Sequence, residues 1–141
     1  MIKQIFKKLE SLEKEIADER GEFSLFGLFL REDAENRWDL VVAASWLNAD
    51  SMDDINYITN KLKSHIGKNE LLFISRIVLL DLHDPIVQII KKNWGVTRGG
   101  SLELNHPQLF GLPFKNAYII ISQSEKPVLV YVGKRRLKQS V

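Results

Sequence analysis

Two apolar runs joined by a short charged segment, between Phe23 and Trp46, constrain the fold of this chain more than any other feature. Their apolar members are Phe23, Leu25, Phe26, Leu28, Phe29 and Leu30 in the first run, and Trp38, Leu40, Val41, Val42, Ala43, Ala44, Trp46 and Leu47 in the second. Neither run alternates cleanly between apolar and polar side chains, which is typical of strands covered on both faces. The charged residues 32–37 suit a connection between antiparallel neighbours. The sequence therefore predicts a hairpin at the centre of a sheet.

Composition places the chain among folded single-domain proteins and narrows its chemistry. Its 141 residues are enough for one domain with a buried core. With 20 basic and 18 acidic side chains, the net charge of +2 is too small for a dedicated nucleic-acid binder. The chain contains no cysteine, which excludes disulfides, thiolate catalysis and cysteine-ligated metal centres.

No segment has the pattern of a membrane span or a secretion signal. No run approaches the roughly 18 consecutive apolar residues of a membrane-spanning helix. Residues 1–14 mix charged with apolar side chains and lack the uninterrupted apolar core of a signal peptide. We therefore expect a soluble cytoplasmic protein that does not bind membranes.

Residues 2–20 are predicted to form an amphipathic helix that ends at Gly21. The apolar side chains that recur at intervals of three and four residues are Ile2, Ile5, Leu9, Leu12 and Ile16. This stripe predicts a helix packed on the sheet. The alternative is a two-heptad seam for dimerisation, because the same spacing suits a coiled coil.

Two further helices are marked by their capping residues. Ser51, with Asp54 three residues later, resembles a capping box, and Gly67 ends this second helix. Asp84 followed by proline starts a third helix, which ends at Gly95.

The remaining apolar runs predict strands at residues 71–80, 96–104, 117–121 and Val128–Val132. A helix that begins near Asn69 and Glu70 is the alternative for the first of them. The pair Gly99 and Gly100 predicts a bulge or bend in the second. The order α-β-β-α-β-α-β-β-β predicts an α+β (α/β-like) domain, a mixed sheet of five to six strands with three helices. We assign this domain to residues 1–132 and a basic, mobile tail to residues 133–141.

Asp81, His83 and Asp84 form the first candidate site. They follow a predicted strand and precede a helix, the place where open α/β sheets bind ligands. A histidine between two carboxylates can act as a base or contribute to a metal site. The simpler interpretation is that Asp84 caps the helix and His83 lies on a polar loop.

Asp39 and Arg76 are charged residues within apolar strands, and they form the second candidate. Buried charge is costly unless it is paired. If the two strands are neighbours, these residues can form an ion pair, or Arg76 can grip a phosphate or carboxylate. Otherwise each faces solvent near a strand end.

The basic tail is a third candidate, for nucleic acid. Its cations are Lys134, Arg135, Arg136 and Lys138. Such a run can contact phosphate backbones without sequence preference. No aromatic residue is interleaved with these cations for base stacking, so a solvated terminus is the simpler interpretation.

Leu25, Phe26, Gly27 and Asp39 resemble, in position, elements of minimal nucleotidyltransferases. That family has a Leu-Phe-Gly-Ser strand followed by a strand whose Asp-x-Asp motif binds two metal ions. Here Leu28 and Arg37 stand where the serine and the first aspartate would be. The resemblance therefore implies a catalytically inactive relative.

The sequence contains no glycine-rich phosphate loop, nucleophile elbow or zinc-binding histidine pair. We therefore expect a non-catalytic binding domain without cofactor or metal, which acts through self-association as a homo-oligomer or through a protein partner. The alternative is a nucleotide- or metal-dependent, enzyme-like domain, which requires that Asp39, Arg76, Asp81, His83 and Asp84 converge on one cleft.

Overall fold

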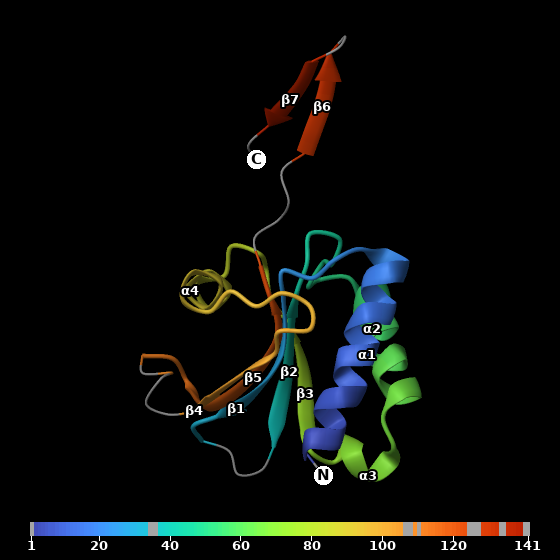
Figure 1. The fold of residues 1–141 in the computed structure, drawn as a ribbon. Coiled ribbons are helices and arrows are strands. Elements are labelled where there is room, and N and C mark those ends of the chain that lie inside the picture. The colour runs from blue at the N-terminus through green and yellow to red at the C-terminus, as the bar shows by residue number, and fades with distance from the viewer. Residues whose placement is uncertain are drawn as a thin grey trace.

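The fold is a mixed five-stranded sheet with helices on both faces (Figure 1). The structure is a computed structural model that describes residues 2–33, 37–105, 109 and 111–123, together with the backbone of two C-terminal strands. The helices are α1 (Ile2–Arg20), α2 (Met52–His65), α3 (Lys68–Leu71) and α4 (Pro85–Asn93). The strands are β1 (Leu25–Arg31), β2 (Trp38–Ala43), β3 (Ile74–Leu79), β4 (Leu102–Asn105), β5 (Phe114–Ser122), β6 (Val128–Val132) and β7 (Arg135–Gln139). The predicted α+β class is confirmed.

Strand β1 lies at the centre of the sheet, whose order is β3-β2-β1-β5-β4. It pairs antiparallel with β2 on one side and with β5 on the other. β2 and β3 run parallel, and α2 lies in the crossover connection that a parallel pair requires. The hairpin predicted from residues 23–46 is therefore the middle of the sheet.

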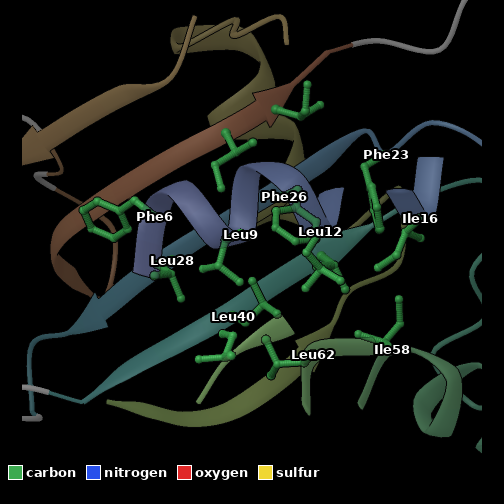
Figure 2. Close-up of a cluster of buried hydrophobic side chains, with 14 of the residues drawn as sticks. Phe6, Leu9, Leu12, Ile16, Phe23, Phe26, Leu28, Leu40, Ile58 and Leu62 are labelled. Atoms are coloured by element: carbon green, nitrogen blue, oxygen red, sulfur yellow. The ribbon is translucent and has the colours of Figure 1, made fainter. Parts of the chain in front are cut away.

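Helices α1 and α2 cover one face of this sheet (Figure 1). Figure 2 shows the apolar side chains that fill the space between them and the strands, among them Leu9, Leu12, Ile16, Phe26, Leu28, Leu40, Ile58 and Leu62. The apolar stripe of α1 is thus buried in the chain's own core. The alternative of a dimerisation seam along this stripe is wrong, because these side chains are already covered by the sheet and by α2.

Helix α4 covers part of the opposite face, where Val87 and Ile90 are fully buried. The strand side chains that meet them alternate with those of the first core and include Leu25, Phe29, Val41, Ala43 and Ile119. Both faces of β1 and β2 are therefore apolar, which explains why neither strand alternates in sequence.

The predicted helix starts at Ser51 and Asp84 are confirmed by their hydrogen bonds, although the Asp54 carboxylate accepts from the N–H of Asn48 and does not complete a capping box with Ser51. Ser51 Oγ accepts a hydrogen bond from the backbone N–H of Asp54 at 3.3 Å, and Asp84 Oδ1 accepts one from the N–H of Ile86 at 2.8 Å. Gly21 follows α1 with a φ of 124°, which an L side chain rarely adopts.

Two segments differ from the prediction. The run at residues 71–80 is not one strand. Its first residue, Leu71, belongs to the one-turn helix α3, so the alternative of a helix near Asn69 and Glu70 is confirmed for this end of the run. The Glu70 carboxylate accepts hydrogen bonds from Gly67 N–H and from Lys8 Nζ, which stabilise this turn. Residues 96–104 are not one bulged strand either. Val96 forms an isolated bridge, Gly99 turns the chain with a φ of 87°, and β4 begins only at Leu102.

The C-terminal strands β6 and β7 pair antiparallel in a two-stranded sheet of their own. Arg135, Arg136 and Lys138 of the predicted tail lie in β7, whereas Lys134 lies outside the described residues. The domain boundary at residue 132 and the mobility of the tail stay predictions. None of the helices that the structure describes is both long and apolar enough to span a membrane.

Candidate functional site

Asp39 and Arg76 lie opposite each other on the parallel strands β2 and β3. Arg76 Nε donates a hydrogen bond to Asp39 Oδ2 at 3.1 Å. The Asp39 side chain is only 2% exposed, whereas that of Arg76 is 55% exposed. The prediction that the two pair if their strands are neighbours is confirmed. A functional role for the pair stays a prediction.

Arg31, at the end of β1, is a third member of this group that the sequence analysis missed. Its Nε lies 3.4 Å from Asp39 Oδ2 and 3.9 Å from Asp33 Oδ1. The register of the hairpin gives the signal that would have found it. Phe29 lies opposite Asp39, so Arg31, two residues further along β1, is on the same face of the sheet. Two guanidinium groups therefore converge on one buried carboxylate.

These three residues line a cavity of about 470 Å³ on the face of the sheet that carries α4. We call this cavity the arginine pocket, and its lining residues are Arg31, Glu32, Asp33, Asp39, Val41, Arg76, Val78, Leu80, Ile86, Pro113 and Phe114. The lining comes from β1, β2 and β3, from the first turn of α4 and from the start of β5. The pocket therefore combines apolar walls with a charged group built on the central strands.

Asp39 Oδ1 and Arg31 Nε are buried atoms with no hydrogen-bond partner among the described residues. Most buried polar atoms in proteins do have a partner, so an orphaned carboxylate oxygen at the wall of a cavity is unusual. The Arg31 Nε is close enough to Asp39 for attraction between charges, although its geometry does not make a hydrogen bond. Asp39 and Arg31 thus attract each other as opposite charges, but each keeps a buried polar atom without a hydrogen bond.

Asp81, His83 and Asp84 lie elsewhere, beyond the carboxyl end of β3. Arg76 and Asp81 are five residues apart along an extended chain, a distance of about 16 Å. Asp81 and His83 line a separate hollow of about 560 Å³ with residues that follow β2, namely Ala44, Ser45, Leu47, Asn48, Ala49 and Asp50. The five candidate residues therefore divide between two places and do not share one cleft.

The contacts of this second group are those of a helix start. Asp84 caps α4, as described above, and Asp81 Oδ1 accepts a hydrogen bond from the backbone N–H of His83 at 2.8 Å. The carboxylate thus holds the His83 backbone and does not orient its ring, and His83 is exposed. Within the described ranges, no group of three or more His, Asp or Glu side chains lies close enough to hold a metal ion.

The buried Glu13 and the partly exposed Arg98 form an ion pair that the sequence did not indicate. Glu13 lies on the inner side of α1, and Arg98 donates to its two carboxylate oxygens at 3.0 and 2.9 Å. These hydrogen bonds raise the pKa of Arg98 above its ordinary value, so the guanidinium stays charged. The pair joins α1 to the loop before β4 and lies on the opposite face of the sheet from the arginine pocket.

A second polar cluster joins α1 to α2. Tyr57 Oη donates a hydrogen bond to Glu19 at 2.7 Å, and Lys61 donates to both Glu19 and Glu15. Burial, together with the hydrogen bond to Glu19, raises the pKa of Tyr57 to about 12. The contacts of this cluster run between the two helices, so we assign it a structural role.

Gly27 and Asp39, which resemble nucleotidyltransferase elements in position, are held by contacts within this fold. Gly27 lies inside β1, and a Cβ atom there would come within 2.8 Å of the Tyr118 carbonyl oxygen of β5. Glycine is thus required by the close approach of two strands. Asp39 is paired with two arginines, which would repel a metal ion.

Comparisons with known proteins identify no relative of this chain. No protein-family model matches the chain, and neither the curated proteins nor the solved structures contain a significant match. The function must therefore be inferred from the geometry of the chain itself.

Proposed function

We propose that the chain is a small, non-catalytic, cytoplasmic interaction domain that acts through self-association or a protein partner, with β3 as the contact. The observation that carries this proposal is the open edge of β3. It is the outermost strand of the sheet, and in the described part of the chain no strand pairs with its outer side. An open strand edge is a template for pairing with another chain.

The outward-facing backbone groups of β3 can be named from the ladder. Leu80 N–H donates to the Val42 carbonyl of β2 at 2.9 Å. Because backbone direction alternates along a strand, Val78 also faces β2, whereas Ile77 and Leu79 direct their N–H and C=O groups outward. These outward groups are free to pair with an added strand.

The side chains along this edge also favour an interface. Ile77, Val78 and Leu79 are only partly buried, and Leu72, just before the strand, is 75% exposed. The opposite edge differs, because β4 has four residues and exposes Glu103 and Asn105. Short strands with polar side chains are protected from edge-to-edge pairing. β3 also exposes Ser75 and Arg76 in its first half, but its second half, residues 77–79, is apolar, so β3 is the less protected of the two edges.

Sedimentation velocity over a series of protein concentrations, combined with amide hydrogen exchange, tests this proposal. If β3 pairs with a second copy, a dimer forms and the amides of Ile77 and Leu79 gain protection as the concentration rises. The amide of Val78 is the internal control, because it bonds β2 and is protected in every state. A monomer at all concentrations, with Ile77 and Leu79 exchanging freely, would remove self-association from the proposal.

No observation favours the alternatives over this proposal. The enzyme-like alternative needs its five polar residues on one cleft, and they lie in two places. Binding of nucleic acid by Lys134, Arg135, Arg136 and Lys138 stays a prediction. It is tested by truncation after Val132 and by the salt dependence of binding, which should be steep for phosphate contacts.

A further inference from the structure

We infer that the arginine pocket binds a small amphipathic molecule that carries an anionic head group on an apolar body. This inference goes beyond association through the β3 edge, because it concerns a ligand of another class on the α4 face of the sheet, although Arg76 and Val78 of β3 also line the pocket. It rests on three properties of the pocket: the free donors of its arginines, the distribution of its carboxylates and the nature of its walls.

The arginines supply unused donors at fixed positions. Arg31 and Arg76 each direct Nε toward Asp39, and none of their Nη groups has a hydrogen bond within the described residues. A guanidinium has five N–H donors in a rigid fork that matches a carboxylate. Asp39 holds Arg76 through a hydrogen bond and attracts Arg31 across 3.4 Å, so part of the conformational entropy of these side chains is already lost before an anion binds.

The carboxylates are arranged so that an anion is not excluded. Asp39 lies between the two guanidinium groups and is 2% exposed. Glu32 is exposed and the Asp33 side chain is 79% exposed, so water screens both at the rim. The whole lining carries two cations and three carboxylates, a formal net charge of −1, but around the buried Asp39 the two guanidinium groups outnumber the single carboxylate.

The walls suit an apolar body. Val41, Val78, Leu80, Ile86 and Phe114 line the pocket, and Val41 and Phe114 are buried parts of the second core. The volume of about 470 Å³ lies within the roughly 300–1,000 Å³ of small-molecule sites. Such sites are mostly apolar with a few converging polar groups that fix the ligand's orientation.

The first test uses the unmodified protein and a matched set of ligands. The probe is the anionic dye anilinonaphthalene sulfonate, whose fluorescence reports its binding, at a protein concentration where sedimentation finds a single species. Octanoate, octanol and octylamine, which share one chain length, then compete with the dye. We expect octanoate to displace it at the lowest concentration and octylamine at the highest. Equal potency of the three, or octylamine as the strongest competitor, overturns the inference.

The second test compares two arginine variants of the same kind. Arg76→Gln removes one guanidinium of the pocket, and we expect octanoate and the dye to bind about tenfold more weakly, because a charge-assisted hydrogen bond is lost. Arg98→Gln is the matched control, since Arg98 also pairs with a buried carboxylate but lies on the other face. Its affinity for the dye should match that of the unmodified protein. Unchanged binding in Arg76→Gln, or equal weakening in both variants, overturns the inference. If Arg76→Gln does not fold, Arg76→Lys takes its place and should bind octanoate more weakly than the unmodified protein.

Discussion

Removal of the Arg98 guanidinium tests how far the Glu13–Arg98 pair stabilises the fold. Glu13 is 1% exposed on the inner side of α1, and Arg98 satisfies both of its carboxylate oxygens. Arg98→Met keeps an apolar stem of similar length but removes the charge. The Glu13 carboxylate is then left buried without its partner, which is the costly state.

The expected loss of stability in Arg98→Met can be worked out from the burial of the two side chains. Breaking a fully buried pair by removing one partner costs about 3–5 kcal/mol. The Arg98 side chain is 40% exposed, so water screens part of the interaction and the lower end of that range applies. We therefore expect Arg98→Met to lower the free energy of unfolding by about 3 kcal/mol. For a chain of this size, the midpoint of thermal unfolding should fall by roughly 10 °C.

Urea unfolding followed by tryptophan fluorescence measures the effect. The expected result is a lower midpoint with an unchanged slope m, because the area exposed on unfolding is the same. The control is the double variant Glu13→Leu/Arg98→Met, which leaves no buried charge and should lose less than about 1.5 kcal/mol. The reasoning is refuted if Arg98→Met lowers the free energy of unfolding by no more than about 0.5 kcal/mol, or if the double variant is at least as unstable as the single one.

Three further predictions concern stability. Gly27→Ala should lower the free energy of unfolding, measured in urea, by about 1–3 kcal/mol, because the new Cβ meets the Tyr118 carbonyl oxygen at 2.8 Å. An unchanged free energy of unfolding would mean that the two strands separate easily. The Tyr57 pKa is raised from 10 to about 12 by burial and by Glu19, so its contribution to stability is complete below pH 10 and is lost between pH 10 and 12. Spectroscopic titration of the tyrosines should show a phenol with a pKa near 12 that is missing in Tyr57→Phe. If this titration step remains in Tyr57→Phe, the assignment to Tyr57 is wrong. Ser51→Ala should lower the free energy of unfolding by about 1 kcal/mol in the same urea assay, because the side-chain cap of α2 is lost. Ser51→Thr, which keeps the hydroxyl, should lower it less.

Elements defined by local chemistry could be predicted from the sequence. The three-and-four spacing of Leu9, Leu12 and Ile16 indicates a helix, because it places them on one side of a 3.6-residue turn. The caps Ser51 and Asp84 satisfy backbone N–H groups two or three residues away, so their effect is already encoded in a short window. Helix α3 could be predicted only as an alternative to a strand, because its Glu70 is held partly by Lys8, 62 residues away along the chain.

The candidate site could be predicted only in part. Asp39 and Arg76 stand out as charges within apolar runs, but their pairing depends on β2 and β3 being neighbours. Arg31 did not stand out, because at the end of β1 it looks like the first residue of a polar turn. Residues 81–84 looked more promising as a site, and their hydrogen bonds are those of a helix cap.

By itself, the sequence determined the types of most elements, the ends of the helices and the requirement that the central strands be covered on both faces. Spacing and capping act over a few residues, so they can be recognised without a structure. Only the tertiary structure decided the strand order, the burial of the α1 stripe within the chain's own core, and the convergence of Arg31 and Arg76 on Asp39. Those contacts join residues that are distant along the chain, and the packing of the whole core brings them together.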